Sequence, residues 1–416
     1  MIIQDVYKNS KNNILFNDSI KYSSLRESLI SNFVLSPKII KNNESLKHLD
    51  PHILEFSYKY KKTSNDITYE NNEEERIDID VINGKITSVK DNVDDKKNIK
   101  ITNISNENNL IQEKFLKFQN YFKDDYISNL NTILLNAGYE IKIDNKKQTN
   151  IIIKNSISEE DLTIFQKNII TCSKKSKVFI IEEYLTHEKS NNNLINFIDL
   201  EEGSEVTHLI FQKNDEKANL QSTSYVNCKA NSNYKQLIIN ISKGSNRNHH
   251  YANLLGENSS INLDGIFFGS KNQFIDNKTQ INHHFPNCTS SQRYKGILTD
   301  QANASYLSKT FVNQIAQKTE AYQLSKGILL SDNSYFHSKP ELEIFADDVK
   351  CSHGSTIGPI DRDLLFYLRS RGLSKKISTS LLIKSFFHDI ITDTYDKKFI
   401  EKFNYHSNIW LKENNI

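Results

Sequence analysis

The stretch "NSNYKQLIINI" (Asn231–Ile241) shows the pattern that decides the fold, a short Asn/Ser cluster followed by a run of apolar residues. Similar units recur between about residues 135 and 355, where almost no helical periodicity is found. The first apolar residues after five such clusters are Val206, Tyr234, Ile261, Tyr306 and Tyr335, at steps of 28, 27, 45 and 29 residues. Three steps agree, and the fourth departs by about half a repeat.

Repeats of 20–50 residues are typical of solenoid proteins. Because the repeats contain strand-like runs and polar corners but no helical pattern, they favour a parallel β-helix over helical repeats. An ordinary β-sandwich with evenly spaced strands is the alternative, but it gives no reason for the repeated order of polar cluster and apolar run. The central region therefore predicts a mainly β fold with a parallel β-helix core.

The chain before the repeats has a mixed α+β texture. Apolar residues recur at helical spacing in "SLRESLISNFVL" (Ser24–Leu35), which predicts a helix. "ERIDIDVINGKITSVKD" (Glu75–Asp91) alternates on both sides of Asn83-Gly84, which predicts a hairpin with a tight turn. Residues 92–110, rich in Asp, Asn and Lys, are interpreted as a solvated linker.

The chain after Gly358 returns to helical periodicity. Asp361 is a candidate N-cap and Gly372 a candidate helix stop, and two further helices are expected, beginning near residues 374 and 396. We therefore predict three domains: an N-terminal mixed region (1–130), the β-helix core (135–358) and a C-terminal helical domain (359–416). Exposed apolar side chains on the helical domain suggest a docking face.

The composition of the 416 residues limits the class of function. Lys+Arg 53 against Asp+Glu 51 gives no excess of charge that would require a nucleic-acid partner. The four cysteines are far apart in the sequence, which fits a reducing compartment rather than a disulfide framework. No apolar run reaches the length of a membrane helix, and the start lacks the apolar core of a secretory signal. We expect a soluble intracellular protein.

Most candidate catalytic groups do not converge in this fold. Asp347 and Asp348 are adjacent, so on a strand their carboxylates point to opposite faces and cannot act as a pair. The same holds for the neighbouring histidines His249-His250 and His283-His284, whereas catalytic zinc needs three convergent ligands. A single inward histidine is more often satisfied by a hydrogen bond.

Cys351 and His353 differ, because their i, i+2 spacing puts both side chains on one strand face. A thiolate and an imidazole are good ligands for iron or zinc, but two ligands do not complete a site. Distant residues of the fold could complete it, a partner chain could complete it, or both residues could only be packed. The spacing alone favours packing, because free cysteine is among the most buried residue types.

Two stretches carry a resemblance to a known family. "HSKPELEIFADDVKCSHGSTIGPIDRDLLFYLRSRGL" (His337–Leu373) closely resembles the SufD signature of the SufB/SufD family, the scaffold subunits of the Suf iron–sulfur cluster assembly machinery. "HHFPNCTSSQRYKGILTDQANASYLSKTFVNQIAQKTEAYQLSKGILLSDNS" (His283–Ser334) is similar to the preceding segment of that family. The resemblance is strong from about residue 245 to 395 and fainter before that.

The resemblance implies a right-handed parallel β-helix between an N-terminal region and a C-terminal helical domain. It also implies a non-catalytic subunit of a SufBCD complex, which pairs with a SufB-like paralogue through the β-helix and binds a SufC-like ATPase through its C-terminal helices. In the SufD form Cys-Ser-His-Gly, here Cys351 to Gly354, the histidine is the implied metal ligand at the interface with the partner. His353 would then bind a transient iron–sulfur cluster, with Cys351 beside it.

Several expectations stay open at this point. Asp347 or Asp348 could orient His353 by hydrogen-bonding its other ring nitrogen. The alternatives to a scaffold are a stand-alone β-helix enzyme and a purely structural homodimer in which Cys351 and His353 only pack. The resemblance decides neither the cluster type nor whether a flavin binds, and it fits either a bacterial cytosol or a plastid-type organelle.

Overall fold

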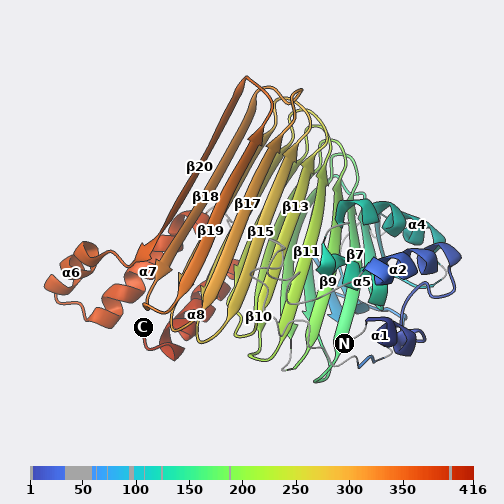
Figure 1. The fold of residues 1–416 in the computed structure, drawn as a ribbon, viewed down its shortest axis with the longest axis horizontal. Helices are drawn as coiled ribbons and strands as arrows, with labels where there is room; N and C mark the ends of the chain where they lie inside the picture. Colours follow the sequence, from blue (N-terminus) through green and yellow to red (C-terminus); the bar gives the residue numbers. More distant parts are fainter. Residues whose placement is uncertain are drawn as a thin grey trace.

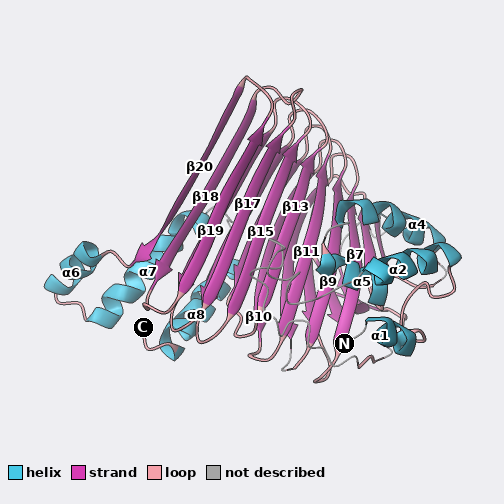
Figure 2. Cartoon of the chain, viewed as in Figure 1, coloured by secondary structure: helices cyan, strands magenta, loops and turns pink. Residues whose placement is uncertain are grey.

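A computed structural model describes residues 3–32, 59–61, 63–72, 74–92, 98–106, 108–122, 125–186, 189–392 and 396–416. Its centre is a parallel β-solenoid of about eight turns, with α+β structure on the N-terminal side and helices on the C-terminal side (Figure 1). The predicted mainly β fold with a parallel β-helix core is therefore confirmed. Figure 2 shows one group of helices at the N-terminal end of the stack of strands, and the C-terminal helices extending from the other end along the stack.

Each coil of the solenoid contributes one strand to each of two facing sheets. In the first sheet the strands of the coils are β6 (Gln148–Ser156), β8 (Lys177–Thr186), β10 (Glu205–Asn214), β12 (Asn233–Asn240), β14 (Ser260–Gly269), β16 (Thr289–Leu298), β18 (Thr319–Leu329) and β20 (Val349–Pro359). In the second sheet they are β5 (Tyr139–Ile143), β7 (Thr163–Cys172), β9 (Asn191–Leu200), β11 (Asn219–Cys228), β13 (Asn246–Leu254), β15 (Phe274–His283), β17 (Asn303–Val312) and β19 (Tyr335–Ile344).

The register explains the irregular repeat in the sequence. Val206 pairs with Tyr234 and Tyr234 with Ile261, so the steps of 28 and 27 residues are true coil lengths. Tyr306 lies on β17 in the other sheet, which accounts for the step of 45 residues. Tyr335 pairs with Asn303 rather than with Tyr306. The step of 29 residues from Tyr306 to Tyr335 is therefore not a coil length, although it is close to one.

The inward faces of the strands carry both apolar and polar side chains, and residues paired in register form rows along the solenoid. One buried row consists of Val178, Val206, Tyr234 and Ile261, and the next consists of Ile180, His208, Gln236 and Leu263. The buried polar side chains are hydrogen-bonded: His208 lies 3.0 Å from both Glu182 and Tyr234, and Gln236 lies 3.3 Å from His250 across the interior. These polar groups therefore have partners inside the solenoid, as buried polar groups require.

The N-terminal region extends both sheets of the solenoid. The predicted hairpin is confirmed as β2 (Ile77–Ile82) and β3 (Lys85–Asp91), and both turn residues have a positive φ, 52° at Asn83 and 76° at Gly84. Paired backbone angles of this kind favour Asn-Gly. β2 pairs in parallel with β6 of the solenoid, and β1 (Thr68–Asn71) pairs with β3.

The interpretation of residues 92–110 as a solvated linker is wrong where the structure describes them. Residues 99–103 form β4 (Ile99–Asn103), antiparallel to β5, with Ile101 and Asn103 buried. The Asn103 amide bonds the backbone of Ile86 on β3, so this polar residue serves the sheet rather than solvent. The described helical elements of the region are α1 (Ile3–Ser10), α2 (Ile20–Asn32), α4 (Asn109–Phe118), η3 (Gln119–Phe122) and α5 (Tyr126–Leu134).

The helix predicted for Ser24–Leu35 is confirmed as far as Asn32, and residues 33–35 lie outside the described ranges. The expected C-terminal helices are α6 (Arg362–Ser370), α7 (Lys375–Thr392) and α8 (Lys397–Glu413), and Asp361 caps α6 as expected. α7 and α8 pack on the outer face of the first sheet, where Phe268 contacts Phe387, Phe403 and Trp410. None of the described helices is long and apolar enough to cross a membrane.

Candidate functional site

The last coil of the solenoid has open strand edges. β20 ends the order of the first sheet and β19 that of the second, so neither strand has a further described strand beside it. An open edge leaves backbone N–H and C=O groups free to pair with another chain. Large apolar side chains are exposed at this end as well, among them Phe345 with 60% of its surface accessible. These features mark the open end as the candidate functional site.

Cys351 and His353 lie on β20 with their side chains toward the solenoid interior. In the parallel pairing of β20 with β18, Cys351 lies beside Ala321 and His353 lies beside Gln323. Ala321 and Gln323 are buried residues that point into the solenoid. Residues paired in register point to the same face of a sheet. Nevertheless His353 is exposed, because no later strand covers the last inward row. The shared face predicted from the i, i+2 spacing agrees with this register.

The two residues differ in their surroundings. Cys351 is half-buried against the cluster of Val312, Ala316 and Ala346, and burial raises the pKa of its thiol. Cys351 is therefore mostly protonated near neutral pH unless a metal binds it. The imidazole of His353 has no hydrogen-bond partner among the described residues, so its ring nitrogens remain accessible to a ligand.

The residue below His353 is held rigidly. Gln323 accepts a hydrogen bond from Ser308 Oγ at 3.0 Å and donates to Thr310 Oγ1 at 2.7 Å and to the Glu341 carbonyl at 3.1 Å. These three partners lie on or beside β17 and β19, so the Gln323 amide joins the two sheets directly under the histidine. Sequence reasoning missed Gln323, because only the register of β18 and β20 shows that it lies below His353.

Asp347 and Asp348 lie in the turn before β20, and both are exposed. The backbone of Asp348 is held by Gln317 Oε1 at 2.9 Å and by the backbone N–H of Lys318 at 2.6 Å. Asp348 lies five positions before His353, which corresponds to about 16 Å along an extended strand. Within this chain the two carboxylates are not brought to His353, and their role in orienting it stays a prediction.

Three further histidines, His249, His250 and His283, are buried in the protein, whereas His284 is half-buried. His249 points outward and lies 2.9 Å from Asp276, whereas His250 points inward to Gln236, as expected for neighbours on a strand. His283 lies 2.8 Å from Ser290. Burial lowers the pKa of His249 to about 4 and that of His250 to about 3. In the described part of the chain, no three His, Cys, Asp or Glu side chains gather as a metal site.

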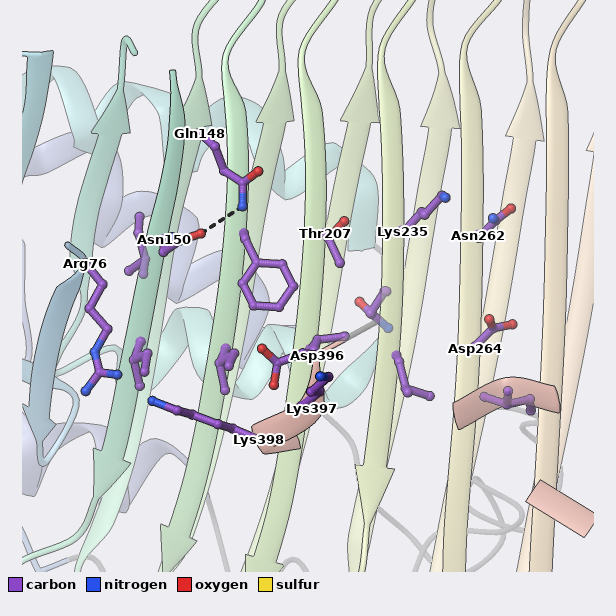
Figure 3. A pocket seen from close by; sticks show the side chains of 18 of the residues that line it. Arg76, Gln148, Asn150, Thr207, Lys235, Asn262, Asp264, Asp396, Lys397 and Lys398 are labelled. Atoms are coloured by element: carbon purple, nitrogen blue, oxygen red, sulfur yellow. Dashed lines mark hydrogen bonds between the residues drawn. The ribbon is translucent and has the colours of Figure 1, made fainter. Parts of the chain in front are cut away.

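A groove of about 780 Å³ lies elsewhere, on the outer face of the first sheet beside the start of α8 (Figure 3). Its wall carries a row of mostly polar side chains that includes Asn150, Thr207, Lys235 and Asn262, and its floor is apolar. Toward β16 the floor ends at the ion pair of Arg293 with Asp264. The described residues that line the groove include no Cys or His, so they lack the thiolate and imidazole ligands that suit iron. The open end of the solenoid remains the better candidate.

Comparison with known proteins identifies a family model that matches residues 155–386. This model is described as "SUF system FeS cluster assembly, SufBD core domain". The matched range begins in the first turns of the solenoid and ends within α7, so it includes Cys351 and His353. The family comparison thus covers the candidate site.

Three curated relatives agree with this match. The chain is 36% identical over 140 residues to the iron–sulfur cluster assembly protein SufD of Escherichia coli, covering 34% of this chain and 33% of that protein. It is 32% identical over 200 residues to an iron–sulfur cluster assembly SufBD family protein of Synechocystis, with coverages of 48% and 44%. It is 28% identical over 221 residues to a chloroplastic protein of Arabidopsis thaliana, with coverages of 52% and 46%. The chain thus spans between a third and half of the length of these relatives.

Proposed function

Because the chain belongs to the SufBD family of the SUF system for iron–sulfur cluster assembly, we propose that it is a SufD-like scaffold subunit. In this proposal the chain catalyses no reaction itself. It holds part of a ligand set for a nascent cluster, and a SufB-like paralogue supplies the rest. The observation that carries the proposal is the position of His353 and Cys351 on an inward row that lies exposed at an open end.

The open end supports a protein partner rather than a small ligand. β19 and β20 offer unpaired backbone groups, and an exposed strand edge is a template for pairing with another chain. The neighbouring apolar side chains would be buried by the same contact, as in the core of a protein interface. Exposed large apolar side chains at this end include Ile315, Tyr322, Tyr335, Ile344 and Phe345. A paralogue with the same solenoid could continue both sheets across the interface.

The C-terminal helices support a second contact. α6 has no buried residue, and 73% of the surface of Phe366 is accessible. Leu364, Tyr367, Ile377 and Leu381 on α6 and α7 are also exposed. Several exposed large apolar side chains on two neighbouring helices are typical of an interaction site. We assign it to a SufC-like ATPase subunit, whose closure would pull on α6–α8 and open the interface near His353.

The proposal places the protein in a cytosol or, as for the chloroplastic relative, in a plastid-type organelle. The affinity-tagged chain should copurify with a paralogue and an ATPase subunit, with iron and sulfide in the complex. Recovery of the chain only as a homodimer would instead favour the purely structural alternative.

The role of His353 is tested in the purified complex with two matched variants. His353→Ala should leave the complex assembled but remove most of its iron and acid-labile sulfide after anaerobic reconstitution. Ser352→Ala, whose exposed side chain points to the opposite face of β20, should behave like the wild type. Full cluster content in His353→Ala would exclude the proposed ligand role.

A further inference from the structure

The groove beside α8 has a wall of accessible polar groups. Thr207 on β10, Lys235 on β12 and Asn262 on β14 pair in register, so their side chains lie side by side on the outer face of the first sheet (Figure 3). Neighbouring strands are about 4.8 Å apart, so the three groups span about 10 Å. Lys235 is exposed and the other two are half-buried, and none of their side chains has a partner among the described residues. A hydroxyl, an ammonium and an amide are therefore available to one ligand.

The charges around the groove favour an anion. The lining residues include five cations and four carboxylates. Three of the carboxylates already have partners, in the ion pairs Asp264–Arg293 and Glu74–Lys398 and in the N-cap of α8, where Asp396 accepts from the backbone of Phe399. Lys235 on the sheet and Lys397 at the start of α8, in contrast, have no ion pair with a described residue. The unpaired charge is thus mainly positive.

Apolar side chains lie next to the polar row. Ile152 on β6 and both Phe179 and Ile181 on β8 line the groove and are half-buried, so part of each surface is accessible. Leu209 and Leu237 continue the row of Ile181 in register but are buried, so they back the floor rather than offer it to a ligand. The accessible apolar surface is therefore compact and suits a ring better than a long chain.

The two parts of the groove fit one small ligand. Its volume of about 780 Å³ is typical of a site for a small organic molecule. Phe179 pairs in register with Thr207, so the apolar patch lies directly beside the row of polar groups. A peptide fits less well, because the groove lies on the face of the sheet, where peptide groups over apolar side chains would lose hydrogen bonds.

We propose that this groove binds a small aromatic anion. The ring packs on Phe179 and Ile181, an arrangement that aromatic side chains favour. The acidic group binds the ammonium of Lys235, and Thr207 and Asn262 donate hydrogen bonds to it. Because Lys397 belongs to α8, the same anion would also attract the start of this helix toward the sheet. The site is separate from the open end of the solenoid and does not depend on the scaffold role.

The ligand class is tested by isothermal titration calorimetry of the full chain with three probes. 4-Phenylbutyrate carries both a ring and a carboxylate, whereas butyrate lacks the ring and 4-phenylbutan-1-ol lacks the charge. Phenylbutyrate should bind saturably at one site. Each of the other two compounds should bind about tenfold more weakly, because one loses the apolar contact and the other the charge-assisted hydrogen bonds.

Two variants locate the site. Lys235→Glu should weaken the binding of phenylbutyrate at least tenfold and leave that of the alcohol unchanged, since only the carboxylate contacts this residue. Phe179→Leu should weaken both compounds alike, because it removes the ring contact. The charge-matched control is Lys217→Glu, in the exposed turn after β10 and outside the groove lining, which should bind as the wild type does. Melting temperatures of the free variants confirm that they are folded.

The inference is overturned if phenylbutyrate shows no saturable binding up to its solubility limit. It is also overturned if Lys235→Glu binds phenylbutyrate as tightly as the Lys217→Glu control does. Neither result affects the proposed scaffold role, because His353 is not among the residues that line the groove.

Discussion

Three histidines of the solenoid, His249, His250 and His283, are buried and uncharged. Burial lowers the pKa of His249 and of His283 to about 4 and that of His250 to about 3, against an ordinary value near 6.5. His249 lies among Arg247, Asp276 and Asp125, and the positive charge of Arg247 adds to the effect of burial. In the unfolded chain each of these histidines takes up a proton at a higher pH than in the folded protein.

We therefore predict that the free energy of unfolding falls as the pH is lowered from about 6.5 to about 4. In this range the unfolded state binds more protons, so each histidine contributes a slope of about 1.4 kcal/mol per pH unit. Urea unfolding at pH 7, 6 and 5 measures the slope. His249→Gln should reduce this slope by about 1.4 kcal/mol per pH unit, because one titrating group is removed. Stability that does not change between pH 7 and 5 would contradict the neutral buried state.

The thiols give a second residue-scale prediction. Cys172, Cys228 and Cys288 are buried, and only Cys351 is partly accessible. Iodoacetamide should therefore label Cys351 alone in the folded protein, slowly at pH 7 because burial raises the pKa of this thiol. Mass spectrometry of the peptides identifies the site. Binding of the paralogue should suppress the labelling, and early modification of Cys172 or Cys228 would contradict the fold.

Neighbouring strands of the solenoid interlock through glycines and aromatic rings. A Cβ added at Gly265 on β14 would lie 2.2 Å from the ring of Tyr294, and one at Gly296 on β16 would lie 2.1 Å from the ring of Phe267. Each ring thus occupies the space that a side chain on the next strand would need. Such overpacking typically costs about 1–3 kcal/mol.

Gly296→Ala should accordingly lower the free energy of unfolding by about 1–3 kcal/mol, because the Phe267 ring must move within a packed interior. The matched control is Gly358→Ala, since a Cβ at Gly358 meets no atom within 4 Å. Denaturant unfolding of both variants gives the comparison. Equal stability of the two variants would show that the strands are less tightly packed than described.

The elements differ in how well the sequence predicts them. The polar corners identify the coils, and Asn83-Gly84 identifies its hairpin, because both features follow from local backbone requirements. β4 was missed because its five residues lie in a polar stretch and are held by pairing with the distant β5. The sequence also did not place Tyr306 in the second sheet, since both sheets use the same pattern of corner and strand.

The candidate site, like the elements, can be predicted from the sequence only where local spacing is enough. The i, i+2 spacing of Cys351 and His353 gives their common face, and no wider context is needed for that step. Gln323 lies beside His353 only through the pairing of β18 with β20, which the sequence alone does not show. Without the coil lengths, which vary along the chain, no sequence pattern marks these residues as neighbours.

At the scale of the whole molecule, the solenoid is covered unevenly. α7 and α8 cover part of the outer face of the first sheet, and the α+β region extends both sheets at the N-terminal side (Figure 1). The last coil, in contrast, carries exposed apolar side chains beside two open edges. The central claim is that a paralogous subunit covers this end and supplies the remaining ligands of the iron that His353 binds.

The most direct measurement of this claim is a crystal structure of the complex with the paralogue, loaded anaerobically with iron and sulfide, with anomalous data collected at the iron absorption edge. We predict an iron peak within about 2.3 Å of a ring nitrogen of His353, at the boundary between the two subunits. An iron site remote from this boundary, with His353 enclosed in a contact that holds no iron, would contradict the account.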